Sequence, residues 1–182
     1  MKGAVFNLLN ELVEEKFGYA AWEHMLQIAD CDGVFVSSET YADDLLVSLV
    51  AAAHEHTQVP VRDLLFSFGQ FMAPAFARDY PVFFENQTSL KAFLLTVDRT
   101  IHVEVRKLYP EAHLPEFDYK DEADNRLTMI YTSPRKLCAL AEGLIQGSAE
   151  HFTERYDLKH NICMHAGNDH CELQLTFLGH SD

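Results

Sequence analysis

Positively charged residues are scarce in this sequence of 182 residues, which has 14 Lys and Arg residues but 28 Asp and Glu residues, for a formal net charge of −14. A surface of this charge repels phosphate backbones and anionic lipid headgroups, so nucleic acid and membranes are poor candidate partners. Long apolar runs are also missing, because no uncharged stretch approaches the ~18 residues of a membrane span and the first residues do not resemble a signal peptide. We therefore expect a cytoplasmic protein.

Cysteine is scarce as well. Four cysteines (Cys31, Cys138, Cys163 and Cys171) are too few for a secreted fold that depends on disulfides, which leaves metal binding or simple burial. The sequence has no G-x-G-x-x-G, G-x-x-x-x-G-K-[ST], H-E-x-x-H, G-x-S-x-G or C-x-x-C-H pattern. The common nucleotide-binding, metalloprotease and hydrolase classes are therefore not indicated.

Apolar residues spaced three and four apart predict helices through most of the first 110 residues. These stripes lie within residues 5–17, 22–29, 41–53, 60–72 and 90–108. Gly18 and Pro110 are natural helix stops, and Ser89 or Thr88 can cap the last helix. Pro74 is expected to bend or end the fourth helix.

The pattern changes after residue 110. Residues 111–118 are expected to form a loop, and from Leu127 the apolar period becomes two, as in a strand. Residues 137–145 return to the helical period, and alternation on both sides of Gly167 predicts a hairpin. This order predicts one domain over residues 1–182, of the α+β class, with an N-terminal helical part and a small antiparallel sheet in the C-terminal part.

His102 lies beside the apolar stripe of the long helix, on a face shared with Leu95, Asp98 and Val105. Its imidazole can therefore point into an interior. A histidine in such a place is either a hydrogen-bonded structural residue or a metal ligand, and its position alone does not decide between the two.

Tyr131, Ser133 and Arg135 alternate across the end of the predicted strand, so two hydroxyls and a guanidinium can project from one side. Arginine offers paired N–H donors to a carboxylate, and each hydroxyl adds a donor, so the trio suits a ligand with two acid groups. The alternative is a buried strand tyrosine beside ordinary surface residues.

Cys138, His160, Cys163 and Cys171 form a second candidate site. Cys163 and Cys171 are equidistant from Gly167, so a hairpin centred there brings their Cβ atoms to ~5 Å, while Cys138 comes from a helix start. Three thiolates and an imidazole form a closed tetrahedral zinc site, although buried free cysteines are the alternative.

Other cysteine and histidine residues are less clear. His165 and His170 flank the predicted turn and are possible alternative ligands to the same metal, whereas Cys31 has no evident partner. The acidic pairs along the chain are interpreted as solvated faces.

The sequence resembles an H-NOX domain, the heme-nitric oxide/oxygen binding family that includes the heme domain of soluble guanylate cyclase. The residues that carry the resemblance are Met1–Gly3, His102, Tyr131–Arg135 and Gly143–Ser148. The resemblance extends over essentially the whole chain. It implies the H-NOX fold and a non-covalent heme b, with His102 as the proximal iron ligand and with Tyr131, Ser133 and Arg135 holding the heme propionates. It also implies that Pro115 presses on the porphyrin, although ordinary turn chemistry is the alternative.

The resemblance further implies an apolar gas-binding pocket lined by Val5, Leu9, Met72, Phe76, Leu140 and Leu144. Oxygen-binding members have a tyrosine three residues before the glycine that matches Gly143, where this chain has Leu140. Bound oxygen gains from a hydrogen-bond donor, whereas nitric oxide binds ferrous iron strongly without one. We therefore expect binding of nitric oxide and carbon monoxide, and discrimination against oxygen.

The function that the resemblance implies is a nitric oxide sensor without catalysis of its own. Its partner would be a histidine kinase or a cyclic-di-GMP synthase or phosphodiesterase on a separate chain. Nitric oxide would weaken the bond from iron to His102 and release the helix that carries it. Some bacterial H-NOX proteins also carry a zinc site that these four ligand positions resemble. The alternatives are an oxygen-binding heme protein, which needs a distal donor, and a zinc-dependent redox sensor or enzyme.

Overall fold

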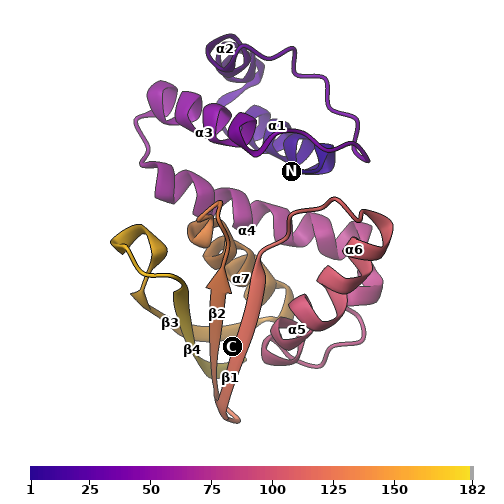
Figure 1. Cartoon of the computed structure of the whole chain (residues 1–182), viewed down its shortest axis with the longest axis vertical. Coiled ribbons are helices and arrows are strands. Elements are labelled where there is room, and N and C mark those ends of the chain that lie inside the picture. Colours follow the sequence, from indigo (N-terminus) through magenta and orange to yellow (C-terminus); the bar gives the residue numbers. More distant parts are fainter. Residues whose placement is uncertain (181–182) are drawn as a thin grey trace. The chain divides into compact units, whose positions relative to one another are not determined.

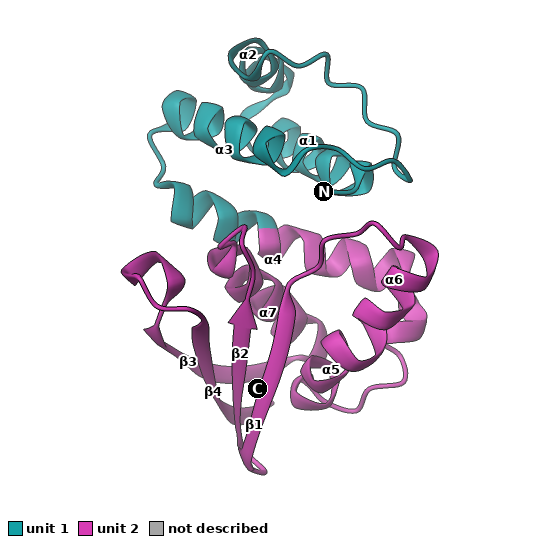
Figure 2. Cartoon of the chain, viewed as in Figure 1, with its two compact units in different colours: residues 1–68 teal, residues 69–182 magenta. Residues whose placement is uncertain are grey.

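The computed structural model describes residues 1–180, which form helices and one four-stranded antiparallel sheet (Figure 1). This arrangement confirms the predicted α+β class. The chain divides into two compact units, Met1–Phe68 and Gly69–Asp182 (Figure 2). Among the described residues, no helix is long and apolar enough to cross a membrane.

The first unit is helical, as the apolar stripes predict. It contains α1 (Gly3–Phe17), α2 (Tyr19–Ala29), α3 (Asp43–Thr57) and the start of α4 (Val61–Asp79). Gly18 separates α1 from α2 with a φ of 83°, a value that glycine adopts without strain. The core of this unit includes Phe6, Met25, Leu46 and Leu49, each no more than 1% exposed.

The sequence predicts that Pro74 bends or ends this helix. α4 continues through Pro74 to Asp79, so Pro74 does not end it. Pro74 lacks the N–H that would bond the Gln70 carbonyl. That carbonyl instead lies against Gly147, where an added Cβ atom would come within 2.5 Å of the oxygen. The packing of α4 on a second helix thus covers the group that proline leaves without a donor.

The predicted helix over residues 90–108 is present but divided. α5 (Leu90–Thr96) is followed by the π-helical turn η2 (Val97–His102) and by α6 (Val103–Leu108). Ser89 caps α5 as predicted, because its hydroxyl accepts a hydrogen bond from the Ala92 amide at 3.1 Å. The wider π turn rotates the residues that follow it, and His102 is its last residue.

The sheet has the strand order β1-β2-β4-β3 and is antiparallel throughout. Its strands are β1 (Glu116–Ala123), β2 (Arg126–Thr132), β3 (Glu154–Ile162) and β4 (Cys171–His180), and α7 (Cys138–Phe152) packs against β3. The predicted strand, helix and hairpin are confirmed. The predicted loop over residues 111–118 is wrong from Glu116 onward, because β1 begins there. β1 is an edge strand in which only Phe117 is buried, so it has little apolar alternation.

Candidate functional site

His102 is held in a largely buried position at the end of the π turn. Its side chain is 12% exposed, and its Nδ1 lies 3.1 Å from Asp98 Oδ1. Its ring lies beside that of Phe117, with centroids 5.9 Å apart. Burial lowers the pKa of His102 and outweighs the opposing effect of Asp98, which favours a neutral imidazole. A neutral imidazole with Nδ1 engaged has Nε2 as its metal-binding nitrogen.

Asp98 also ties the π turn to the sheet. Its backbone amide donates a hydrogen bond to the Tyr119 hydroxyl of β1 at 3.3 Å, and its carboxylate lies 3.8 Å from Arg106 Nη2. Arg99 lies over the Tyr119 ring at 5.5 Å from its centroid, and burial raises the pKa of Tyr119 to about 12. Tyr119 therefore stays a neutral hydroxyl. Sequence reasoning placed Asp98 on the His102 face but gave it no role.

The predicted trio lies where β2 passes into α7. The side chains of Tyr131 and Ser133 are 2% exposed, and the Tyr131 hydroxyl accepts a hydrogen bond from the Leu137 amide at 2.9 Å. Ser133 Oγ accepts one from the Arg135 amide at 3.3 Å, and Arg135 Nη2 donates one to the His113 carbonyl at 2.5 Å. These contacts gather two hydroxyls and a guanidinium into one short segment.

Phe117 connects this trio with His102. Its ring contacts the His102 ring on one side and meets the Tyr131 ring edge-on at 5.5 Å. The Pro115 carbonyl lies close enough to the imidazole to oppose, weakly, the lowering of its pKa by burial. The structure thus brings together the predicted iron ligand, the predicted propionate donors and Pro115. A neutral imidazole beside hydroxyl and guanidinium donors is the set that an iron porphyrin with two carboxylates requires, so the residues present fit heme b.

The predicted pocket residues are divided between the units. Val5 and Leu9 belong to α1 of the first unit, and Met72, Phe76, Leu140 and Leu144 belong to the second. Within the second unit, α4 and α7 approach closely at Gly69, because a Cβ atom there would meet the Leu140 carbonyl and lie 2.7 Å from the Leu144 amide nitrogen. Met72 and Leu140 are buried, and none of the four side chains has a hydrogen-bond donor.

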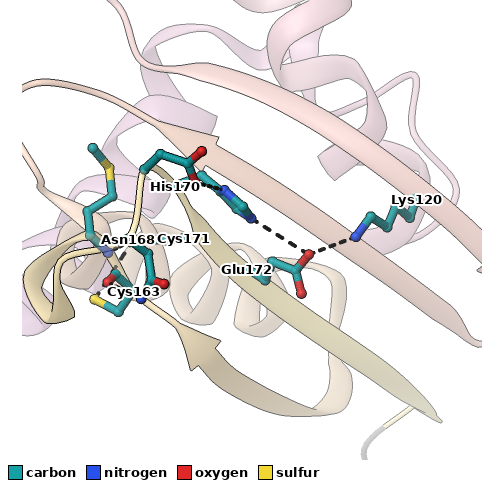
Figure 3. A network of polar contacts seen from close by, with 8 residues as sticks. Lys120, Cys163, Asn168, His170, Cys171 and Glu172 are labelled. Atoms are coloured by element: carbon teal, nitrogen blue, oxygen red, sulfur yellow. Dashed lines mark hydrogen bonds and ion pairs between the residues drawn. The ribbon is translucent and has the colours of Figure 1, made fainter.

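The four predicted zinc ligands come together at one end of the sheet. One potential ligand atom from each of Cys138, His160, Cys163 and Cys171 lies within 4.8 Å of all the others. The sulfurs of Cys138 and Cys171 are each 3.9 Å from that of Cys163. Figure 3 shows Cys163 and Cys171 close together, beside the turn that joins β3 to β4.

A β-bulge allows His160 and Cys163 to face the same side, although they are three residues apart. His160 pairs with Leu173 and Ile162 with Glu172, so one extra residue is inserted in β3. The insertion reverses the alternation of faces between the two ligands. A regular strand would have directed them to opposite faces, and no local pattern in the sequence marks the bulge.

His160 also has the hydrogen bonding of a metal ligand. Its Nδ1 lies 2.5 Å from Oε1 of Glu142, whose side chain is 6% exposed, and its Nε2 is buried without a hydrogen-bond partner. A buried acceptor without a donor is costly unless a cation occupies the space beside it. Burial and the neighbouring Cys171 raise the pKa of the Cys138 thiol to about 12, as expected for thiols gathered without a cation. The residues present therefore fit zinc.

Sequence reasoning missed Glu142. The available signal was a single acid within the otherwise apolar start of α7. The possible alternative ligands have other partners, because His165 Nε2 lies 2.8 Å from the Lys136 carbonyl and His170 contacts Asp169 and Glu172 (Figure 3). Glu172 in turn accepts a hydrogen bond from Lys120 at 2.7 Å.

Comparisons with known proteins agree with this arrangement. Residues 2–160 match the family model described as Haem-NO-binding. Soluble guanylate cyclase 89Db of Drosophila melanogaster is 26% identical over 146 residues, which cover 74% of this chain but 20% of that protein. The chain therefore spans about a fifth of the length of this relative.

Solved structures match over nearly the whole chain. An H-NOX protein from S. oneidensis in the Fe(II)NO ligation state is 34% identical, with a TM-score of 0.92 and coverage of 98% of this chain and 100% of that one. The SO2144 H-NOX domain from Shewanella oneidensis in the Fe(II)CO state is 34% identical, with a TM-score of 0.88 and coverage of 97% and 98%. An unliganded Fe(II) H-NOX protein from K. algicida is 28% identical, with a TM-score of 0.90 and coverage of 97% and 96%.

Proposed function

Because the chain belongs to the haem-NO-binding, or H-NOX, family of heme-based gas-sensor domains and has its fold, we propose that it is a nitric oxide sensor that regulates a separate signalling enzyme. In this proposal residues 1–182 act as one heme-binding domain. The observation that carries it is the buried, neutral imidazole of His102, held by Asp98 and placed across Phe117 from the Tyr131 hydroxyl.

His102 would hold the heme iron through Nε2, because Asp98 engages Nδ1. Tyr131, Ser133 and Arg135 would hold the propionates, and Arg135 would exchange its present bond to the His113 carbonyl for a carboxylate. Heme b supplies a ferrous iron that binds diatomic gases. Pro115, next to His102, would contact the porphyrin.

Selectivity follows from the side chains that would line the gas pocket. Met72, Phe76, Leu140 and Leu144 of the second unit offer no donor that could stabilise oxygen and no partner that could hold an ordered water. We propose binding of nitric oxide and carbon monoxide with discrimination against oxygen. The structures of the S. oneidensis relatives in the Fe(II)NO and Fe(II)CO states support this choice of ligands.

Signalling would start at the π turn. Asp98 connects His102 to Tyr119 of β1, so release of His102 from iron would loosen a segment that is otherwise tied to the sheet. We propose that this change is transmitted to a histidine kinase or a cyclic-di-GMP synthase or phosphodiesterase on another chain, and that this domain performs no catalysis itself. A bacterial cytoplasmic setting suits such partners and keeps cysteine thiols reduced.

We propose Zn2+ as a second cofactor, bound by Cys138, His160, Cys163 and Cys171. The unpartnered Nε2 of His160 carries this proposal, together with the Glu142 carboxylate that holds its Nδ1. Four protein ligands leave no open position for a substrate, so the site would be structural or redox-sensitive and not hydrolytic.

Absorption spectra of the purified ferrous protein under nitric oxide, carbon monoxide and air test the heme proposal. We expect changes with the first two gases and no stable oxygen complex. His102→Gly should lose the spectrum of histidine-ligated iron and regain it with free imidazole, whereas His113→Gly, which removes an exposed side chain, should leave it unchanged. An unaltered spectrum in His102→Gly without imidazole would exclude His102 as the ligand.

Metal analysis tests the zinc proposal independently. The unmodified protein should contain about one equivalent of zinc per chain, and Cys163→Ser/Cys171→Ser should contain none. Cys31→Ser should behave like the unmodified protein, because Cys31 lies in the first unit. Stoichiometric zinc in the double variant would reject this ligand set.

A further inference from the structure

Two histidines of the first unit form a pair that the proposed sensor function does not use. His24 lies in α2 and His56 in the last turn of α3, and their ring centroids are 5.4 Å apart with an interplanar angle of 57°. Both residues are exposed, and among residues 1–180 neither ring has another hydrogen bond or ion pair. All their ring nitrogens are thus open to solvent or to a ligand.

The separation of the rings suits two ligands of one metal ion. An imidazole nitrogen lies about 1 Å from its ring centre and about 2 Å from bound Zn2+, so two adjacent ligands have ring centroids roughly 4.5 to 5.5 Å apart. The observed 5.4 Å is within this range. A tilt of 57° also differs from the parallel arrangement that stacked rings adopt. We propose that His24 and His56 form a second metal site, separate from the thiolate site, for a divalent cation that prefers imidazole, with Zn2+ as the occupant.

The charges around the pair favour a cation. α2 and α3 contain no Lys or Arg, so neither helix places a cationic side chain near the pair. Glu23 and Glu55 directly precede the two histidines in the sequence. His56 also lies at the C-terminal end of α3, where the partial negative charge of the helix end attracts cations.

Buried neighbours keep the two backbones in place. Met25 follows His24 and is 1% exposed, and Ala52 and Ala53, one turn before His56, are 0% and 6% exposed. The pair is therefore carried by packed helices and not by mobile loops, which lowers the cost of ordering the ligands. A bound ion would connect α2 and α3 across the irregular segment 30–42 and, because it binds the folded form, would stabilise that form against unfolding.

His54 provides a matched control. It is exposed and lies on α3 two residues before His56, but its Nδ1 is 2.7 Å from the Val59 carbonyl and its ring contacts no other histidine among the described residues. His54→Ala removes the same side-chain type from the same helix without touching the pair.

The test is a titration of the heme-loaded protein with Zn2+ at neutral pH, starting from protein whose thiolate site already contains one equivalent. We expect a second equivalent to bind, and its affinity to fall at least about tenfold in His24→Ala and in His56→Ala but not in His54→Ala. The same ion should raise the midpoint of thermal unfolding by a few degrees in the unmodified protein and in His54→Ala only.

Two results would overturn the proposal. One is the absence of a second equivalent at roughly 100 µM free Zn2+. The other is a second equivalent whose affinity is the same in His24→Ala as in the unmodified protein, which would indicate adventitious binding only. Circular dichroism confirms that each variant is folded, as expected for changes at exposed positions. The experiment measures binding of a second equivalent of Zn2+, so its result does not depend on the proposed gas-sensing function.

Discussion

The carboxylate of Glu142 holds the imidazole of His160 from inside the protein. Oε1 of Glu142 lies 2.5 Å from Nδ1 of His160, with the two side chains 6% and 12% exposed. A carboxylate can accept the Nδ1 proton of a neutral imidazole, which leaves the buried Nε2, without a partner of its own, as the nitrogen that can bind a metal. α7 supplies this carboxylate one turn after it supplies Cys138, so a single helix provides both a ligand and the support of another ligand.

Glu142→Gln should weaken zinc binding by about 10- to 100-fold, because a neutral amide holds the His160 tautomer less firmly and makes the imidazole less basic. Zinc transfer to a chromogenic chelator measures the change. Glu150→Gln is the control, since Glu150 lies on the same helix but is exposed and contacts Gln70 and Gln146. Equal zinc retention in both variants would remove Glu142 from the metal site.

Asp98→Asn should weaken the bond between the heme iron and His102. The amide oxygen can still accept the Nδ1 hydrogen bond, but without charge it makes the imidazole a poorer donor to iron. Resonance Raman spectra of the ferrous protein should show a lower iron–histidine stretching frequency, while heme content stays the same. Asp118→Asn, on an exposed position of β1, should leave the frequency unchanged.

Arg135→Ala should weaken heme retention more than it weakens the fold. A charge-assisted hydrogen bond to a propionate contributes about 1.5 to 3 kcal/mol of binding, whereas the guanidinium now donates to the backbone carbonyl of His113. Heme transfer to apomyoglobin measures retention, and thermal unfolding of the heme-free form measures the fold. Heme loss no faster than in the unmodified protein would contradict the propionate role.

Leu140→Tyr should give a partial gain of oxygen affinity. The substitution introduces a hydroxyl donor on α7, but no polar neighbour among Met72, Phe76 and Leu144 orients it. Spectra of the reduced protein in air measure the gain, and Leu140→Phe is the control of similar size without a donor. A stable oxygen complex of the unmodified protein would mean that another donor reaches the gas.

Gly147→Ala should destabilise the second unit by about 1 to 3 kcal/mol, because the added methyl group has no space. The new Cβ atom would lie 2.5 Å from the Gln70 carbonyl oxygen and 2.7 Å from the Ala73 Cβ atom. Denaturant unfolding of the heme-free protein measures the loss. An unchanged midpoint would show that α4 and α7 can separate slightly at little cost.

Much of the helical framework follows from the sequence alone. The apolar stripes predicted the helices of both units, Gly18 predicted the break after α1, and Ser89 predicted the cap of α5. The symmetry of Cys163 and Cys171 about Gly167 predicted that the two residues would lie opposite each other, and their sulfurs are 3.9 Å apart. These features depend on neighbouring residues or on one turn, so local patterns are sufficient to specify them. The heme roles of individual residues came from family resemblance, and the zinc ligands came from their spacing and chemistry as well as from the resemblance; both sets stay predictions.

Contacts between distant segments decided the rest. β1 was missed because an edge strand with one buried residue takes its structure from pairing with β2 and not from its own pattern. The π turn was missed because its apolar residues keep the spacing of an ordinary helix. The extra residue in β3 before Cys163 was missed because a bulge is defined by the pairing of β3 with β4 and not by the sequence of β3 alone. The role of Glu142 depends on a histidine from another element of the sheet. In each case the deciding energy comes from hydrogen bonds and packing across long sequence separations, which a local pattern does not contain.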